Sequence, residues 1–87
     1  MLTVTQAAYA QLVQLLDEAE GPKGTAVRYV IEKDGFTVQF DRPRSSDTTF
    51  EHEGRIVLAL DKQISRKLSK KTLDVKQTLG GVVLGLR

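Results

Sequence analysis

The sequence predicts an α+β domain that is mainly β, with one long helix near the N-terminus and one short helix in the second half. Three observations predict this class. Residues 6–20 repeat apolar side chains at the helical period, residues 25–40 alternate between apolar and polar, and residues 55–60 form a segment of strand length that is apolar without a break after Arg55. The chain has 87 residues, of which 40% are apolar and 28% charged, a length that suits one hydrophobic core. We therefore expect a single domain over residues 1–87.

The first predicted elements are a short strand and the long helix. Leu2-Thr3-Val4 alternates as a strand does, and the Thr5 hydroxyl can cap a helix start by accepting a backbone N–H. The helix predicted over residues 6–20 gathers apolar side chains on one face, namely Ala8, Leu12, Leu15, Leu16 and Ala19. Gly21-Pro22 should end it, because glycine accepts a left-handed conformation and proline cannot continue the hydrogen-bond ladder.

A hairpin and a loop are predicted next. The alternating segments 25–32 and 36–40 flank Lys33-Asp34-Gly35, and Asp-Gly is a strong signal for a tight turn in which both central residues have positive φ. Residues 41–49 include a proline and two serines and are expected to form a mobile surface loop.

The second half is predicted to hold the buried strand and the short helix. Residues 50–54 read as a strand and turn, and residues 55–60 should form a strand that is buried on both faces. Asp61 is suited to cap a helix over Lys62–Lys70. Strands over residues 73–79 and 82–84, separated by the bend at Gly80-Gly81, should complete the domain.

Several local strings resemble the HesB-like family, the A-type iron-sulfur carriers. They occur in the family's order across nearly the whole chain: Leu2-Thr3-Val4-Thr5 with Ala7-Ala8, the hairpin tip Gly35-Phe36, Phe50-Glu51-His52-Glu53-Gly54, Val57 with Asp61, and Thr72-Leu73-Asp74. The resemblance implies a pseudobarrel of mixed, folded β-sheets with an N-terminal helix. It also implies a cluster-carrying role that depends on three cysteines, one before the hairpin Gly-Phe and a Cys-x-Cys pair in a C-terminal tail.

The cluster ligands that the resemblance implies are missing from these residues. Lys33 stands where the first cysteine is expected, the sequence ends at Arg87 before the tail, and the chain contains no cysteine. Iron-sulfur clusters are held by thiolates, whereas a protonated lysine has no lone pair to donate. We therefore expect a HesB-like domain without a cluster or other cofactor, acting as an accessory or interaction module.

Neither a metal site nor a catalytic site is evident. His52 lies between two glutamates in a predicted strand, where neighbouring side chains point to opposite faces, so we interpret it as an ordinary surface histidine. Nucleophilic catalysis needs a base beside the nucleophile, and none of the serines at 45, 46, 65 and 69 has an evident partner. A small enzyme is therefore the least favoured of the three functions considered.

Basic residues are the candidates for partner binding. Residues 55–87 carry eight basic against two acidic groups, and four of the basic ones recur on the outer face of the second helix: Lys62, Arg66, Lys67 and Lys70. With Lys33, they could contact an acidic protein, such as one of iron-sulfur metabolism by descent, although a solvated helix face is the simpler interpretation. Binding of a polyanion such as RNA or DNA is the alternative, disfavoured because no aromatic residue interleaves the charges.

Location and assembly follow from composition. The absence of cysteine gives no reason to expect an oxidising compartment, and the N-terminal apolar stretch is interrupted by glutamines, so we expect no membrane span and a cytoplasmic protein. Five aromatic residues make a thin core, which would gain from burying a partner surface. We accordingly expect a homodimer, the symmetric assembly that the resemblance also implies.

Overall fold

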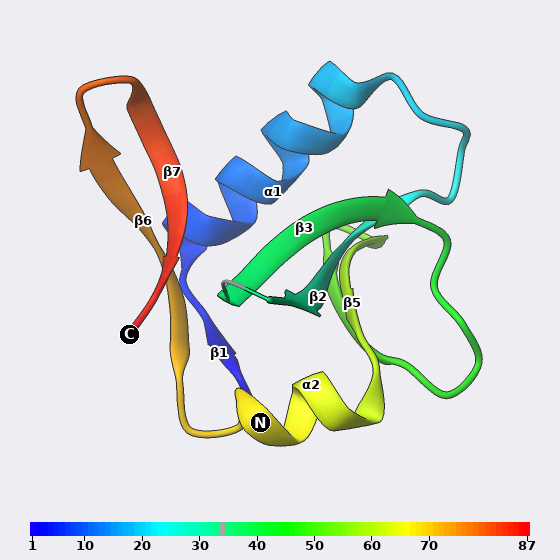
Figure 1. Cartoon of the computed structure of the whole chain (residues 1–87). Helices are drawn as coiled ribbons and strands as arrows, with labels where there is room; N and C mark the ends of the chain where they lie inside the picture. The colour runs from blue at the N-terminus through cyan, green and yellow to red at the C-terminus, as the bar shows by residue number, and fades with distance from the viewer. Residues whose placement is uncertain (34) are drawn as a thin grey trace.

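Two mixed sheets pack against the N-terminal helix in the computed structural model, which describes residues 1–33 and 35–87 (Figure 1). In chain order the elements are β1 (Thr3–Val4), α1 (Gln6–Ala19), β2 (Ala26–Glu32), β3 (Gly35–Asp41), β4 (Thr48–His52), β5 (Arg55–Leu60), α2 (Lys62–Lys67), β6 (Thr72–Thr78) and β7 (Gly81–Leu86). The predicted α+β class, mainly β with a long and a short helix, is confirmed. No helix among the described residues is both long and apolar enough to span a bilayer.

The strand order explains how distant segments come together. The four-stranded sheet has the order β3-β2-β5-β4, and the three-stranded sheet has the order β1-β6-β7. Each sheet holds one parallel pair, β2 with β5 and β1 with β6, among antiparallel neighbours. The chain therefore leaves β3 at one edge of the larger sheet and enters β4 at the opposite edge. The loop of residues 42–47 has to cross the sheet to make this connection.

The core lies where α1 meets strands of both sheets. Leu12 of α1, Val27 of β2 and Leu73 of β6 have no exposed surface, and α1 contacts β2, β5, β6 and β7. The last four residues of β5, Val57 to Leu60, are fully buried, so the predicted burial on both faces is confirmed for this part of the strand, whereas Arg55 is exposed and Ile56 partly buried. This burial is expected for a strand with neighbours on both sides and helices packed against it.

The predicted N-caps are confirmed. The Thr5 hydroxyl accepts a hydrogen bond from the backbone N–H of Ala8 at 3.1 Å, and Asp61 accepts one from the N–H of Ile64 at 2.8 Å. Thr5 Oγ1 also donates to Asp74 Oδ1 at 2.9 Å. One hydroxyl therefore starts α1 and ties it to β6, the strand that pairs in parallel with β1.

The structure differs from expectation at the ends of both helices. The left-handed residue that terminates α1 is Glu20, with φ 50°, and Gly21 follows it. The buried apolar side chains of α1 end at Leu16, one turn before Glu20. We infer that packing of this face sets where the helix ends, and that it overrides the preference for glycine at the left-handed position. The helix α2 ends at Lys67, because Leu68 has left helical geometry and Ser69 donates its N–H to Arg66 three residues back at 3.3 Å.

The hairpin turns are only partly described. Register pairs Glu32 with Gly35 across the predicted hairpin, whose Asp34 lies outside the described residues. The turn between β4 and β5 is described in full, and its two central residues, Glu53 and Gly54, have φ of 53° and 80°. Two consecutive residues with positive φ match the twist of the flanking strands.

Candidate functional site

The basic residues predicted for partner binding gather at one end of the molecule. Ile64 and Leu68 are buried beneath α2, so the helix has to direct its polar residues outward. Lys62, Arg66 and Lys67 are exposed on α2, and Lys70 is exposed in the turn that follows it. We call these four residues the basic helix surface. None of the four forms an ion pair with a residue that the structure describes.

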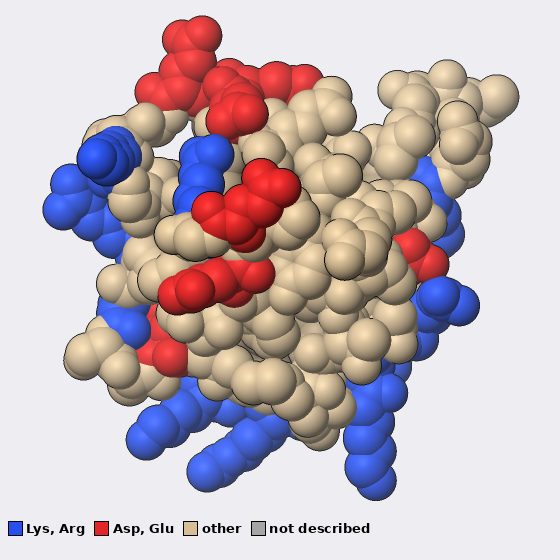
Figure 2. Space-filling view, turned by 180° about the vertical axis from the view of Figure 1, so that it is seen from behind, with Lys and Arg blue, Asp and Glu red and all other residues tan. Residues whose placement is uncertain are grey.

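Charge is unevenly distributed over the face that Figure 2 shows. Figure 2 shows Lys and Arg side chains projecting from the lower end, where Figure 1 places α2, and a group of Asp and Glu side chains higher on the same face. Lys33 is also exposed, but it lies in the turn between β2 and β3, on a different element from the basic helix surface. The folded chain therefore keeps the charge asymmetry of its sequence.

Arg28 is the ionisable residue whose role the sequence did not predict. It lies on β2 between Val27 and Tyr29, and its side chain is 4% exposed and that of Asp47 1%. Arg28 Nη1 donates to Asp47 Oδ1 at 3.2 Å, Nη2 donates to Asp47 Oδ2, and Nη2 also reaches the carbonyl of Arg42 at 3.4 Å. The buried pair joins the second face of β2 to the crossing loop.

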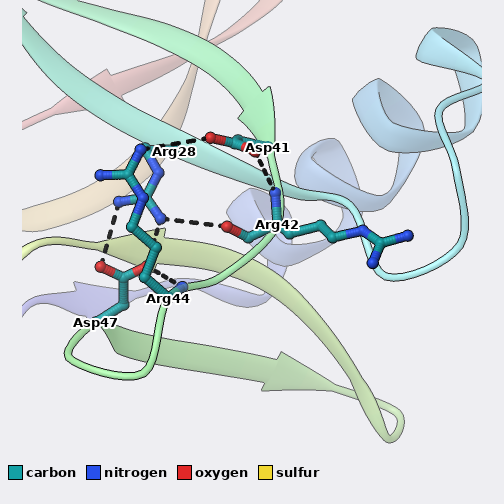
Figure 3. A network of polar contacts seen from close by, with 5 residues as sticks. All are labelled: Arg28, Asp41, Arg42, Arg44 and Asp47. Carbon is teal, nitrogen blue, oxygen red and sulfur yellow. Dashed lines mark hydrogen bonds and ion pairs between the residues drawn. The ribbon is translucent and has the colours of Figure 1, made fainter.

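The crossing loop is anchored at several points (Figure 3). Asp47 Oδ2 accepts the backbone N–H of Arg44 at 2.7 Å, and Asp41 Oδ1 accepts that of Arg42 at 2.8 Å. An exposed ion pair joins Arg44 to Asp41 at 3.6 Å. The prediction of a surface loop is confirmed, since Arg42, Arg44, Ser45 and Ser46 are exposed, and its mobility stays a prediction. The buried carboxylate of Asp47 holds both the strand and the loop backbone at one end of this segment. The loop sequence, with its two serines, gives no sign that Asp47 pairs with Arg28, which is nineteen residues earlier in the chain.

The pair shifts the protonation of both partners. The hydrogen bond from Arg28 lowers the pKa of Asp47 below its usual value, and the backbone N–H of Arg44 adds to this. The hydrogen bond to Asp47 raises the pKa of Arg28 despite its burial. Nε of Arg28 has no hydrogen-bond partner among the described residues. Nη1 and Nη2 of Arg28 donate hydrogen bonds to Asp47 and to the carbonyl of Arg42, which indicates a structural network.

Two hollows lie on the surface. The larger, of about 600 Å³, is bounded by the loop of residues 21–25 and the β4–β5 hairpin, and contains Glu51 and Arg55. The smaller, of about 330 Å³, is a groove between the two sheets. Gln11 and Leu15 of α1 and Tyr29 of β2 line it together with residues of β3 and β7, namely Phe36, Thr37, Val38, Val82, Val83 and Leu84. We call it the inter-sheet groove.

His52 does not belong to a metal site within the described residues. Its ring stacks on Tyr9 of α1, with ring centres 5.2 Å apart and an interplanar angle of 15°. No group of three His, Cys, Asp or Glu residues that could hold a metal ion occurs in the described part of the chain. His52 was expected to be an ordinary surface histidine, and the structure gives it a packing contact with the helix.

Comparison with known proteins places the fold among iron-sulfur proteins. SufA of Escherichia coli, involved in biosynthesis of iron-sulfur clusters, is 24% identical with a TM-score of 0.77, over 99% of this chain and 83% of SufA. IscA, crystallised with a [2Fe-2S] cluster, is 15% identical with a TM-score of 0.66, over 100% and 84%. A protein from Aquifex aeolicus solved by NMR is 18% identical with a TM-score of 0.68, over 99% and 89%. No family model and no curated protein matches the sequence.

These likenesses confirm the HesB-like fold that the sequence resemblance implied. The residues of this chain do not fit a cluster of the kind that IscA holds. Clusters are bound by thiolates, the 87 residues include no cysteine, and Lys33 is an exposed amine at the hairpin turn. What this scaffold presents instead is the basic helix surface and the inter-sheet groove.

Removing one partner of the buried pair is expected to destabilise the fold strongly. Asp47→Ala leaves the Arg28 guanidinium charged and unpaired in the interior and should lower the free energy of unfolding by about 3–5 kcal/mol. The matched control is Asp17→Ala, which breaks an ion pair with Arg55 that is exposed on both sides and should cost less than about 1 kcal/mol. Urea denaturation measures both. Equal losses would contradict a structural role for the buried pair.

The same pair predicts how stability depends on pH. Because the folded pKa of Asp47 is lowered, its contribution is complete above the unfolded value near 3.8 and is lost as pH falls below that value through the folded pKa. Asp47→Asn should therefore flatten the fall in melting temperature below about pH 4. Asp17→Asn should leave that fall unchanged. An acid limb that is identical in Asp47→Asn and wild type would refute this assignment.

Proposed function

We propose that these 87 residues form a non-enzymatic interaction domain, which uses the HesB-like scaffold to contact a protein partner and carries no cluster of its own. The fold supports a place in iron-sulfur metabolism, because its structural neighbours SufA and IscA include a protein involved in cluster biosynthesis and one that holds a cluster. The chemistry of the residues supports the loss of cargo, since no thiolate is available to hold iron. Its place of action is then the cytoplasm.

The observation that carries the proposal is the basic helix surface. Its four side chains are exposed without an ion-pair partner among the described residues, so they are available to another molecule. Asp61 caps α2 itself, but the Asp and Glu side chains that Figure 2 shows gather mainly away from this end, which gives the domain an orientation in the field of a charged partner. An acidic protein surface fits this arrangement, with charge pairing at the rim that speeds association and sets the register.

A catalytic role has little support in the described residues. His52 is engaged in stacking on Tyr9, and no serine hydroxyl donates a hydrogen bond to it. Proton transfer needs a base within hydrogen-bond reach of the group that it activates. Glu51, Lys23 and Arg55 line the larger hollow, but no hydrogen bond or ion pair joins Glu51 to either of them in the described part of the chain.

Nucleic acid remains the alternative polyanion. The basic helix surface could contact phosphates, but no aromatic side chain lies between its charges to stack on bases. The net charge of +2 is also small for a protein that binds nucleic acid by charge alone. A protein partner is therefore favoured.

Anaerobic reconstitution tests the loss of cargo. The purified domain, incubated with iron, sulfide and a thiol reductant and then desalted, should show no visible absorption band and less than about 0.1 iron per chain, because no thiolate is present. IscA treated in parallel is the positive control for the procedure. A stoichiometric cluster that survives desalting would refute the proposal.

A pair of matched variants tests the docking surface. The double variant Arg66→Ala, Lys67→Ala removes two charges from the basic helix surface, whereas Lys23→Ala, Lys76→Ala removes two exposed charges elsewhere. Affinity capture with quantitative mass spectrometry should show acidic proteins retained by wild type and control and reduced about 10-fold or more by the first variant.

Two further outcomes of this experiment are decisive. Nuclease treatment of the lysate should not change the retained proteins, since the contact is between proteins. If nuclease abolishes retention, the polyanion is nucleic acid and a protein partner is excluded. If the two double variants retain the same proteins in the same amounts, the basic helix surface is not the docking site.

A further inference from the structure

The strand β3 is an open edge of the four-stranded sheet. All seven of its residues, Gly35–Asp41, are exposed, and β2 is the one element with which it shares extensive contact within the described chain. Every second residue of an edge strand directs its N–H and C=O groups away from the sheet. Such groups are a template for another strand, and proteins usually protect them with charges, bulges or a covering element.

The sequence of β3 is symmetric about its central residue. It reads Phe36-Thr37-Val38-Gln39-Phe40, so apolar and polar residues are arranged identically in both directions from Val38. No charged residue occurs between Gly35 and Phe40. An interface between two identical copies across a two-fold axis has to be self-complementary, and a palindromic strand meets this condition when it pairs antiparallel with itself.

The other described edges lack this combination. The opposite edge of the same sheet, β4, is interrupted between Phe50 and Glu51 and carries charge in its last residues. In the smaller sheet, β1 has two residues, and β7 already receives a hydrogen bond from the Gln11 side chain to the carbonyl of Val82 at 3.4 Å. Of these edges, β3 is long, uncharged and symmetric at once.

We propose that β3 pairs with β3 of a second copy of this chain, in antiparallel register centred on Val38. This proposal stands apart from the proposed function, since it concerns a different surface. In this register Phe36 faces Phe40 of the second copy, Thr37 faces Gln39, and Val38 faces its own counterpart. Asp41 faces a glycine, so no like charges oppose each other. The two four-stranded sheets then become one continuous sheet.

The apolar face of β2 favours this register. Phe40, Val38 and Phe36 lie opposite Val27, Tyr29 and Ile31, so all six residues share one face of the sheet. Directly opposed residues in an antiparallel pair also share a face, which places the phenylalanines of both copies on the same side. Shifting the pairing by two residues in either direction removes one phenylalanine from the paired segment.

The partly exposed side chains of this face provide the apolar area that a dimer has to bury. Ile31, Phe36, Val38 and Phe40 are each between 38% and 45% exposed. Phe36 and Val38 also form one side of the inter-sheet groove, so the grooves of the two copies would open on the same face. Self-pairing thus covers aromatic surface that the single chain leaves in water.

A charge at the symmetry centre tests the proposal. Val38→Lys places two ammonium groups opposite each other and should weaken the dimer about 100-fold or more. The control is Val83→Lys on β7, which starts from nearly equal exposure, 43% against 40%, and adds the same charge across the inter-sheet groove, on an edge strand of the other sheet. Sedimentation equilibrium at several concentrations gives the dissociation constants. Circular dichroism and thermal melting verify that each variant is folded.

Mixing complementary variants tests the register itself. Because residue 38 is predicted to face itself, Val38→Lys and Val38→Glu should each be monomeric alone and should form a mixed dimer when combined. Wild type and Val83→Lys should remain dimeric. Such a pattern supports pairing centred on Val38, because no other register brings the two introduced charges into direct opposition.

Three results would overturn the proposal. They are a wild type that is monomeric at all concentrations, a dimer that Val38→Lys leaves intact, and equal disruption by Val83→Lys. A monomeric wild type would leave the β3 edge to a strand from a different protein. None of these results bears on reconstitution or on the basic helix surface, so the two proposals fail independently.

Discussion

The crossing of the chain from one edge of the larger sheet to the other is the constraint on which the rest of the structure depends. The loop of residues 42–47 passes over central strands whose second face would otherwise meet water, and Arg28 and Asp47 hold it there. Burying an arginine is costly unless its charge is paired and its donors are used. Asp47 neutralises the charge, and the loop backbone is bound through Arg42 and Arg44, so of the guanidinium donors only Nε lacks a partner among the described residues.

A second tie joins the two sheets to the helix, and it explains why the strings that carry the HesB-like resemblance belong together. Thr5 caps α1 and bonds Asp74, while Thr3 and Val4 pair with Thr72 and Leu73. The N-terminal string and the Thr72-Leu73-Asp74 string therefore form one structural unit. These residues maintain the scaffold and take no part in holding a cluster. A fold can thus persist after its ligands are replaced, because packing and ligation depend on different residues.

The surface offers two distinct kinds of contact. At one end, α2 presents flexible cationic side chains whose attraction acts at a distance and weakens with salt. On the β3 edge, the exposed groups are backbone amides and apolar side chains, whose interactions are short-ranged and geometrically specific. The first kind suits a transient partner and the second a permanent one. A domain could use both together, since the two surfaces lie on different elements.

The sequence by itself determined the α+β class, the order of elements, the caps at Thr5 and Asp61 and the burial of β5, because each depends on residues close together in the chain. The sequence also showed directly that these residues include no cysteine thiol. Tertiary structure decided the rest. Alternation on β2 places Arg28 on the face opposite Val27 and Tyr29, but only the crossing loop brings Asp47 to it; the left-handed residue at the end of α1 is Glu20 and not the glycine. The exposure of β3 also became visible only with the strand order, because pairing between distant segments decides which strand is left at an edge.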